Sequence, residues 1–345
     1  MIPGPFLLYL GHSNDAVGIK TSRGVAAFRP DDCVGEWRHD DCSLTLGLPR
    51  MDADQARGAG ARTLILGIAN AGGRMGEALV EDALAAIAAG MNVASGLHQR
   101  LRDEPRIAGA AAAAGVTLFD VRDPPADLPV GNGKRRAGNR LLTVGTDCSV
   151  GKMYTTLALY DAMRARGIAA DFRATGQTGI LIAGSGVPID AVVADFISGA
   201  IETITPARDD DGWDLVEGQG SLFHPSFAGV STGLLHGAQP RALVLCHDPS
   251  REHMRGLPHY TLPDLATCLA ANLSVARLTS PDVQAVGVAL NTTQLSEADA
   301  RQLCAETGAA LDLPCTDPYR FGADPIIDWM QTCFDISTPP MTVSA

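Results

Sequence analysis

The segment that decides the fold is Gly145-Thr146-Asp147-Cys148-Ser149-Val150-Gly151-Lys152-Met153-Tyr154. An apolar run, residues 140–144, precedes it and an amphipathic stretch, residues 155–166, follows it, which indicates the order strand, glycine loop, helix. In such a loop the glycines let backbone N–H groups point inward, and the following helix presents the positive end of its dipole. Lys152 adds a positive charge for anionic oxygens. We therefore expect this segment to be a phosphate-binding loop.

The loop departs from the common pattern G-x-x-x-x-G-K-[ST] at two points. One additional residue precedes Gly151, and Met153 follows Lys152 where the pattern has a serine or threonine that binds Mg²⁺. A thioether is a poor replacement for that hard oxygen ligand. Thr155 and Thr156 follow closely, and the sequence leaves open whether either hydroxyl takes its place. The pattern favours a loop that holds a diphosphate without a metal, such as that of coenzyme A, and we expect no metal site.

Strand-like and helix-like segments alternate along the chain in two series. The first series has a strand at 63–69, a helix at 77–89 and strands at 92–95 and 116–122. Residues 123–139 then become rich in proline, glycine and basic side chains, as expected at a domain boundary. The second series has strands at 140–144, 169–175, 215–217, 242–246 and 283–290. Such alternation predicts an α/β protein with parallel sheets. We expect domains at 1–130 and 140–345, joined by a linker at 131–139.

Composition and charge exclude several classes of protein. The chain has 345 residues, and 27 basic against 39 acidic residues give a net charge of −12, which argues against a nucleic-acid partner. No apolar run is long enough to cross a membrane, and the opening residues 1–9 lack a basic leader, so we expect a cytoplasmic protein without a membrane partner. The eight cysteines are scattered, which favours neither a zinc site nor a disulfide framework.

The candidate catalytic residues follow the predicted strand at 215–217. In an open α/β sheet, ligands bind beyond the carboxyl ends of the strands, so the loops after Val144, Thr175 and Glu217 are expected to converge. Glu217 ends an apolar strand, where burial would make its carboxylate a better proton acceptor, and it is our first candidate for a general base. His224 lies in the same loop and is a candidate base or acid, because histidine changes charge near neutral pH.

A further group of residues is suited to binding a substrate with carboxylate groups. Glycine-rich turns expose backbone N–H groups, amide side chains donate hydrogen bonds, and an arginine pairs with a carboxylate in a forked geometry. An alternative role for Cys148, as a nucleophile that forms a covalent intermediate, also stays open, because it lies at a helix start. The candidate substrate-binding residues are Arg173, Gln177, Thr178, Gly179, Gln219 and Ser221.

Two resemblances add to this interpretation. The phosphate loop and the segment Val216-Glu217-Gly218-Gln219-Gly220 resemble the dethiobiotin synthetase branch of P-loop proteins over residues 140–330. Nearly the whole chain resembles a family long known only as a domain of unknown function. Its signatures are Ala69-Asn70-Ala71-Gly72-Gly73, Ala174-Thr175-Gly176-Gln177-Thr178-Gly179, Gly186-Val187-Pro188-Ile189-Asp190-Ala191-Val192 and Glu217-Gly218-Gln219-Gly220-Ser221-Leu222-Phe223-His224-Pro225.

The second resemblance implies both a fold and an activity. It implies an N-terminal Rossmann-like parallel sheet followed by a doubly wound α/β domain similar to P-loop NTPases. Some members of the family are D-amino-acid N-acetyltransferases, so it also implies acetyl transfer from acetyl-CoA, as co-substrate, to the amine of an acidic D-amino acid, with D-glutamate as the expected acceptor.

Two other functions remain open at this point. The first is an ATP- and Mg²⁺-dependent kinase or ligase of the dethiobiotin synthetase type, which the order of Lys152, Thr155 and Glu217 supports. The second is a regulatory protein that binds a nucleotide without turnover. If the protein is an enzyme, whether an acetyltransferase or a kinase or ligase, we expect a homo-oligomer, as is general for such enzymes.

Overall fold

The structure is a computed structural model that describes residues 2–16, 18–68 and 73–336. The chain forms two compact units, which we call the first unit (residues 1–124 and 176–191) and the second unit (residues 125–175 and 192–345). The division near residue 124 is close to the expected linker at 131–139. Residues 176–191, however, pack with the first unit, whereas the sequence analysis assigned all of 140–345 to one domain. Dividing the sequence into continuous stretches misses residues 176–191, because local sequence does not show which of the two sheets a helix packs against.

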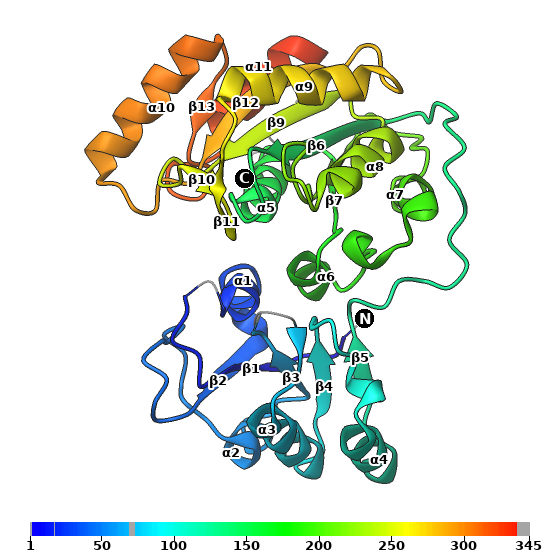
Figure 1. Cartoon of the computed structure of the whole chain (residues 1–345), viewed down its shortest axis with the longest axis vertical. Coiled ribbons are helices and arrows are strands. Elements are labelled where there is room, and N and C mark those ends of the chain that lie inside the picture. The colour runs from blue at the N-terminus through cyan, green and yellow to red at the C-terminus, as the bar shows by residue number, and fades with distance from the viewer. Residues whose placement is uncertain (1, 17, 69–72, 337–345) are drawn as a thin grey trace, which may run out of the picture. The chain divides into compact units, whose positions relative to one another are not determined.

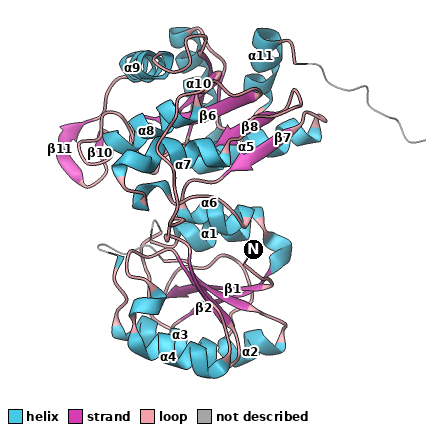
Figure 2. Cartoon of the chain, turned by 90° about the vertical axis from the view of Figure 1, so that its right-hand side faces the viewer, coloured by secondary structure: helices cyan, strands magenta, loops and turns pink. Residues whose placement is uncertain are grey.

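The first unit is built on a parallel sheet. Its elements are β1 (Phe6–Gly11), α1 (Lys20–Phe28), β2 (Cys33–Arg38), α2 (Ala53–Gly58), β3 (Thr63–Leu66), α3 (Glu77–Ala88), β4 (Asn92–Ser95), α4 (Pro105–Ala114), β5 (Leu118–Asp120) and α6 (Gln177–Ala183). The strand order is β2-β1-β3-β4-β5, so the chain extends the sheet to one side of β1 and then returns to the other. This reversal places the connecting helices on both faces, as Figure 2 shows for α1 on one face and α3 with α4 on the other; α6, which follows β7 (Ala170–Arg173), lies beside α1.

Four of these ten elements of the first unit were predicted from the sequence. The strands expected at 92–95 and 116–122 are β4 and β5, and the helix expected at 77–89 is α3. The strand expected at 63–69 is β3, although residues 69–72, with most of the first family signature, lie outside the described residues. Strands β1 and β2 were missed. The run Phe6–Leu10 is fully buried, but at the start of the chain it was considered only as a possible leader.

The second unit is built on a larger parallel sheet, whose strands other than β8 are labelled in Figure 1. Its elements are β6 (Asn139–Gly145), α5 (Lys152–Ala165), β7 (Ala170–Arg173), α7 (Ile197–Ile204), β8 (Trp213–Val216), α8 (Ala228–Ala238), β9 (Ala242–His247), β10 (His253–Met254), β11 (Leu257–Thr261), α9 (Leu265–Arg277), β12 (Gln284–Leu290), α10 (Glu297–Leu311), β13 (Cys315–Thr316) and α11 (Asp324–Phe334). The strand order is β13-β12-β9-β6-β8-β7, and β10 and β11 form a separate antiparallel hairpin. The predicted α/β class with parallel sheets is confirmed.

The core of the second unit fixes the strand that leads into the phosphate loop. Strands β6, β8 and β9 are buried along almost their whole length, as expected for parallel strands covered on both faces. Trp213 is fully buried, with its ring 5.2 Å from that of Phe334 on α11. Leu159 and Met163 of α5 pack into the same core. The loop between β6 and α5 is therefore held between two firmly packed elements. Among the described residues, no helix is long and apolar enough to span a membrane.

Candidate functional site

The loops that follow β6, β7 and β8 meet at the carboxyl edge of the sheet, as the sequence predicted. The backbone N–H of Gly218 donates to Thr143 Oγ1 at 2.9 Å, and Ser221 Oγ donates to the Thr146 carbonyl at 3.0 Å. The backbone N–H of Thr175 donates to Glu217 Oε2 at 2.9 Å. Three segments far apart in the sequence are thus tied into one cluster by buried hydrogen bonds.

Glycine is required at two positions of this cluster. Gly151 precedes the first residue of α5 with φ of +100°, a left-handed conformation that glycine adopts without steric cost. Gly218 passes so close to β6 that an added Cβ would lie 1.7 Å from the Thr143 carbonyl oxygen. Gly151 thus provides the backbone turn into α5, and Gly218 lets the Gly218–Ser221 turn lie directly against β6.

Lys152 is the cation of the phosphate loop. Its side chain is buried, and Nζ donates to the carbonyl oxygen of Asp147 at 2.7 Å. Burial lowers the pKa of Lys152, because the charged ammonium loses hydration. An incoming phosphate oxygen can replace the Asp147 carbonyl as hydrogen-bond partner and would favour the charged form.

Two arginines that the sequence analysis missed also contact the loop. Arg251 donates to the carbonyl oxygens of Cys148 and Ser149, at 2.8 and 2.7 Å, and contacts Asp147 Oδ2 at 3.2 Å. Arg255 donates through its backbone N–H to the same oxygen at 2.7 Å, and through Nη1 to Ser149 Oγ at 2.6 Å. Both follow β9, whose carboxyl end lies beside that of β6, and this adjacency in the sheet was the signal available.

The hydroxyl groups after Met153 are engaged within the fold. Thr156 Oγ1 lies 2.9 Å from Thr143 Oγ1 and donates to the Lys152 carbonyl at 2.7 Å. The Thr155 hydroxyl is hydrogen-bonded to the thiol of Cys246, whose pKa is raised to about 11 by burial. Both threonine side chains are buried. Both hydroxyls are thus directed to neighbouring strands, Thr155 to β9 and Thr156 to β6.

Glu217 lies buried at the centre of the cluster. Besides the contact from Thr175, its Oε1 accepts a hydrogen bond from Gln219 Nε2 at 3.2 Å. The Thr175 hydroxyl donates to the Glu217 backbone carbonyl at 2.5 Å. Because donors reach both carboxylate oxygens, the side chain is held in place as a hydrogen-bond acceptor, the form that a general base requires.

His224 is also buried, with 3% of its surface exposed. Its Nδ1 accepts a hydrogen bond from the backbone N–H of Ser226 at 3.2 Å, and its ring packs at 4.5 Å from that of Phe227. Its Nε2 has no hydrogen-bond partner among the described residues. One ring nitrogen, Cys148 Sγ and a carboxylate oxygen of Asp147 lie within 4.8 Å of one another.

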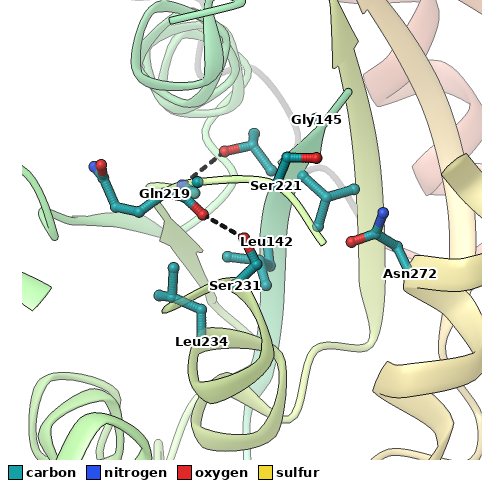
Figure 3. Close-up of a pocket in the computed structure, with 11 residues that line it drawn as sticks. Leu142, Gly145, Gln219, Ser221, Ser231, Leu234 and Asn272 are labelled. Carbon is teal, nitrogen blue, oxygen red and sulfur yellow. Dashed lines mark hydrogen bonds between the residues drawn. The ribbon is translucent and has the colours of Figure 1, made fainter. Parts of the chain in front are cut away.

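Three of the predicted substrate-binding residues have partners in the second unit. Arg173 forms an ion pair with Asp214, with Nη2 2.8 Å from Oδ1, and Ser221 holds the Thr146 carbonyl. Figure 3 shows the Ser231 hydroxyl hydrogen-bonded to the Gln219 carbonyl at 2.8 Å, with the Gln219 side chain extending away from Ser221 and Asn272. The cavity drawn there measures about 10 Å³, room for one water molecule at most, so no substrate fits in it.

The other three, Gln177, Thr178 and Gly179, belong to the first unit. They start α6, where Thr178 Oγ1 lies 3.0 Å from Thr21 Oγ1 of α1. The Gln177 side chain packs on Gly96, just after β4, where an added Cβ would lie 1.8 Å from Gln177 Oε1. Their assignment to substrate stays a prediction.

Comparison with known proteins identifies relatives over almost the whole chain. The family model described as "Domain of unknown function (DUF1611_C) P-loop domain" matches residues 129–327, and "Domain of unknown function (DUF1611_N) Rossmann-like domain" matches residues 32–124. A curated D-glutamate N-acetyltransferase of Tritonibacter scottomollicae is 49% identical over 95% of this chain and 98% of its own length. One from a Pseudoalteromonas species is 46% identical over 94% and 98%.

A crystal structure provides a third comparison. A DUF1611 family protein from Anabaena variabilis superposes with a TM-score of 0.88 at 33% identity, covering 96% of this chain and all of the other. The Rossmann-like and P-loop architecture expected from the sequence is confirmed by the family models.

Proposed function

Because the chain belongs to the DUF1611 family and is an N-acetyltransferase, we propose that it transfers the acetyl group of acetyl-CoA to the amine of D-glutamate. Both curated relatives carry that substrate in their names, and they cover nearly the whole chain. The phosphate loop holds the diphosphate of coenzyme A, and Glu217 acts on the amine.

We favour acetyl-CoA over Mg²⁺-ATP because of the side chains that follow Lys152 in the sequence. Met153 offers a thioether, and the hydroxyls of Thr155 and Thr156 are directed to Cys246 and Thr143. A Mg²⁺-dependent P-loop enzyme needs a hydroxyl ligand at this place. A diphosphate bound by backbone N–H groups, the α5 dipole and Lys152 needs none.

In the proposed reaction Glu217 takes a proton from the attacking nitrogen. The amine attacks the thioester carbonyl carbon, a C–N bond forms, and the C=O electron pair moves to oxygen. When the C=O bond re-forms and the C–S bond breaks, coenzyme A leaves as a thiolate that takes up the proton accepted by Glu217, which gives the thiol and restores the carboxylate. Glu217 is suited to this step because Thr175 and Gln219 hold its two oxygens in place within a buried cluster.

The direct test is to mix the protein with acetyl-CoA and D-glutamate and to follow thiol release together with formation of N-acetyl-D-glutamate. L-Glutamate and D-aspartate serve as comparison substrates for stereochemistry and chain length. The proposal requires thiol release that depends on D-glutamate, and the absence of release with any amino acid would refute it. Calorimetric titration with CoA, ATP and ADP, with and without Mg²⁺, separates it from the kinase and regulatory alternatives, since only those require tight binding of ATP or ADP.

A further inference from the structure

The side chains of Asp147, Cys148 and His224 form a group whose chemistry depends on one ring proton. Their ligand atoms lie within 4.8 Å of one another, a spacing compatible with a cysteine nucleophile activated by histidine or with a metal centre. The two roles share one requirement, because in each of them a ring nitrogen of His224 must offer a free lone pair to the thiol proton or to the metal. The hydrogen bonds around the group decide whether such a lone pair exists.

The contact from Ser226 fixes the tautomer of His224. A backbone N–H is always a donor, so Nδ1 must accept the hydrogen bond from Ser226 with its lone pair. In a neutral imidazole the ring proton is then on Nε2. Protonating Nδ1 as well would place two hydrogens against each other. In this tautomer the buried Nε2–H of His224 is a donor, and no described residue accepts from it.

This tautomer is unsuitable for both conventional roles of the group. Neither ring nitrogen offers a free lone pair, so His224 can neither remove the Cys148 proton nor bind a metal. Asp147 is committed as well, because Oδ1 accepts from the Cys148 N–H at 2.6 Å and Oδ2 from the backbone N–H of Arg255. Nε2–H of His224 is instead a hydrogen-bond donor that is held beside the phosphate loop.

We propose that Nε2–H of His224 donates to the carbonyl oxygen of the acetyl thioester and stabilises the negative charge that develops there. This proposal rests on the proposed acetyl transfer, and within that reaction it gives His224 the role of stabilising the oxyanion. When the amine attacks, the C=O electron pair moves to the oxygen that His224 holds. When C–S cleavage restores the C=O bond, the ring proton is still on Nε2. A buried donor without a partner is well suited to this role, because it needs no reorganisation before it meets the oxyanion.

Access to Nε2 follows from the contact between Lys152 and Asp147. In the structure Lys152 Nζ is bonded to the carbonyl of Asp147, in the turn that lies against the imidazole. A diphosphate that takes over Nζ releases this carbonyl and removes one of the contacts that hold the Asp147–Cys148 turn beside His224, while the contacts from Arg251 and Arg255 remain. Binding of the donor substrate therefore acts on the turn next to the oxyanion site.

The first test reads the tautomer without any activity measurement. Nitrogen-15 NMR of the histidine-labelled protein, with His224 identified by the signals missing from His224→Gln, is expected to show an unprotonated Nδ1 and a protonated Nε2 near neutral pH. A protonated Nδ1 overturns the proposal, as does zinc bound in stoichiometric amount after purification.

The second test compares side chains that keep or remove the donor. His224→Gln retains an N–H group in a similar position, whereas His224→Leu retains only bulk. We expect His224→Leu to lose about 10²- to 10³-fold in kcat and His224→Gln to lose clearly less, with the pH profile unchanged. His236→Gln is the matched control, since Nε2 of His236 on α8 is likewise buried without a described partner; its kcat should stay near wild type.

The outcomes separate the two proposals. Equal loss in His224→Gln and His224→Leu, together with loss of one limb of the pH profile, means that His224 transfers a proton and overturns the donor role. Full activity in His224→Leu overturns it too. If His224→Leu fails to fold, the tautomer measured in the wild type still decides. If the wild type acetylates no amine, the proposed function fails, and the NMR result shows separately whether His224 is a fixed donor.

Discussion

Lys152 Nζ and the carbonyl oxygen of Asp147 are joined by a hydrogen bond of 2.7 Å, so the cation of the phosphate loop is bound to the loop itself. A ligand phosphate must compete with this internal partner. The gain in interaction energy is large, because the buried ammonium then pairs with a negatively charged phosphate oxygen in place of a neutral carbonyl.

Binding of coenzyme A should depend on pH through Lys152. Burial lowers its pKa, and an anion favours the charged form, so affinity is highest below the lowered pKa and falls as the pH rises through it toward 10.5. Calorimetric titration of CoA above the range where phosphate itself titrates, roughly pH 6, checks this. Lys152→Arg stays charged throughout and should flatten the dependence. A wild-type affinity that is constant up to pH 10 would contradict the prediction.

Replacing the cation should weaken binding more than it slows the reaction. Lys152→Ala removes a charge-assisted hydrogen bond worth about 1.5–3 kcal/mol, which corresponds to an increase in KM for acetyl-CoA of roughly 10- to 100-fold. Glu217→Gln should instead lower kcat by about 10²- to 10⁴-fold with CoA binding retained. Steady-state kinetics on both variants tests this division, and equal changes of kcat and KM in the two would refute it.

Arg251 should stabilise the conformation of the phosphate loop, although we do not expect it to contact the diphosphate. It donates to the carbonyls of Cys148 and Ser149, so Arg251→Ala is expected to loosen the turn and to raise KM for acetyl-CoA by about 10-fold. Arg301→Ala is the control, because that arginine pairs with Glu297 on an exposed helix face where such pairs contribute little. The prediction is wrong if both variants leave KM unchanged.

His247 should make stability fall in acid. Its Nδ1 lies 2.9 Å from Thr146 Oγ1, and burial lowers its pKa below the ordinary value of 6.5. Between the lowered pKa and 6.5 the unfolded chain binds more protons, so stability decreases as the pH falls through this window and gains nothing from His247 above it. Thermal melts of wild type and His247→Gln check this, with a smaller loss in the variant below pH 6.5. Parallel curves would show that His247 does not contribute.

Gly218 should tolerate no side chain. An added Cβ would overlap the Thr143 carbonyl oxygen at 1.7 Å, and backbone cannot yield as a flexible side chain does, so Gly218→Ala should cost about 3 kcal/mol or more. At Gly229, an exposed position of α8, an added Cβ meets nothing within 4 Å, and alanine should stabilise by about 0.5–1 kcal/mol. Denaturant unfolding measures both. Similar stabilities for the two variants would rule out the close approach.

The sequence by itself determined the α/β class and the position of the phosphate loop, because strands, glycines and the helix that follows are local features. It also determined that the loops after β6, β7 and β8 meet, since parallel strands share a carboxyl edge. The assignment of 176–191 to the first unit, the contacts of Arg251 and the direction of the hydrogen bond at His224 depended on the tertiary structure. The first two join groups distant in sequence, whereas Ser226 and His224 are close neighbours whose hydrogen-bond direction depends on geometry that residue type and spacing do not contain.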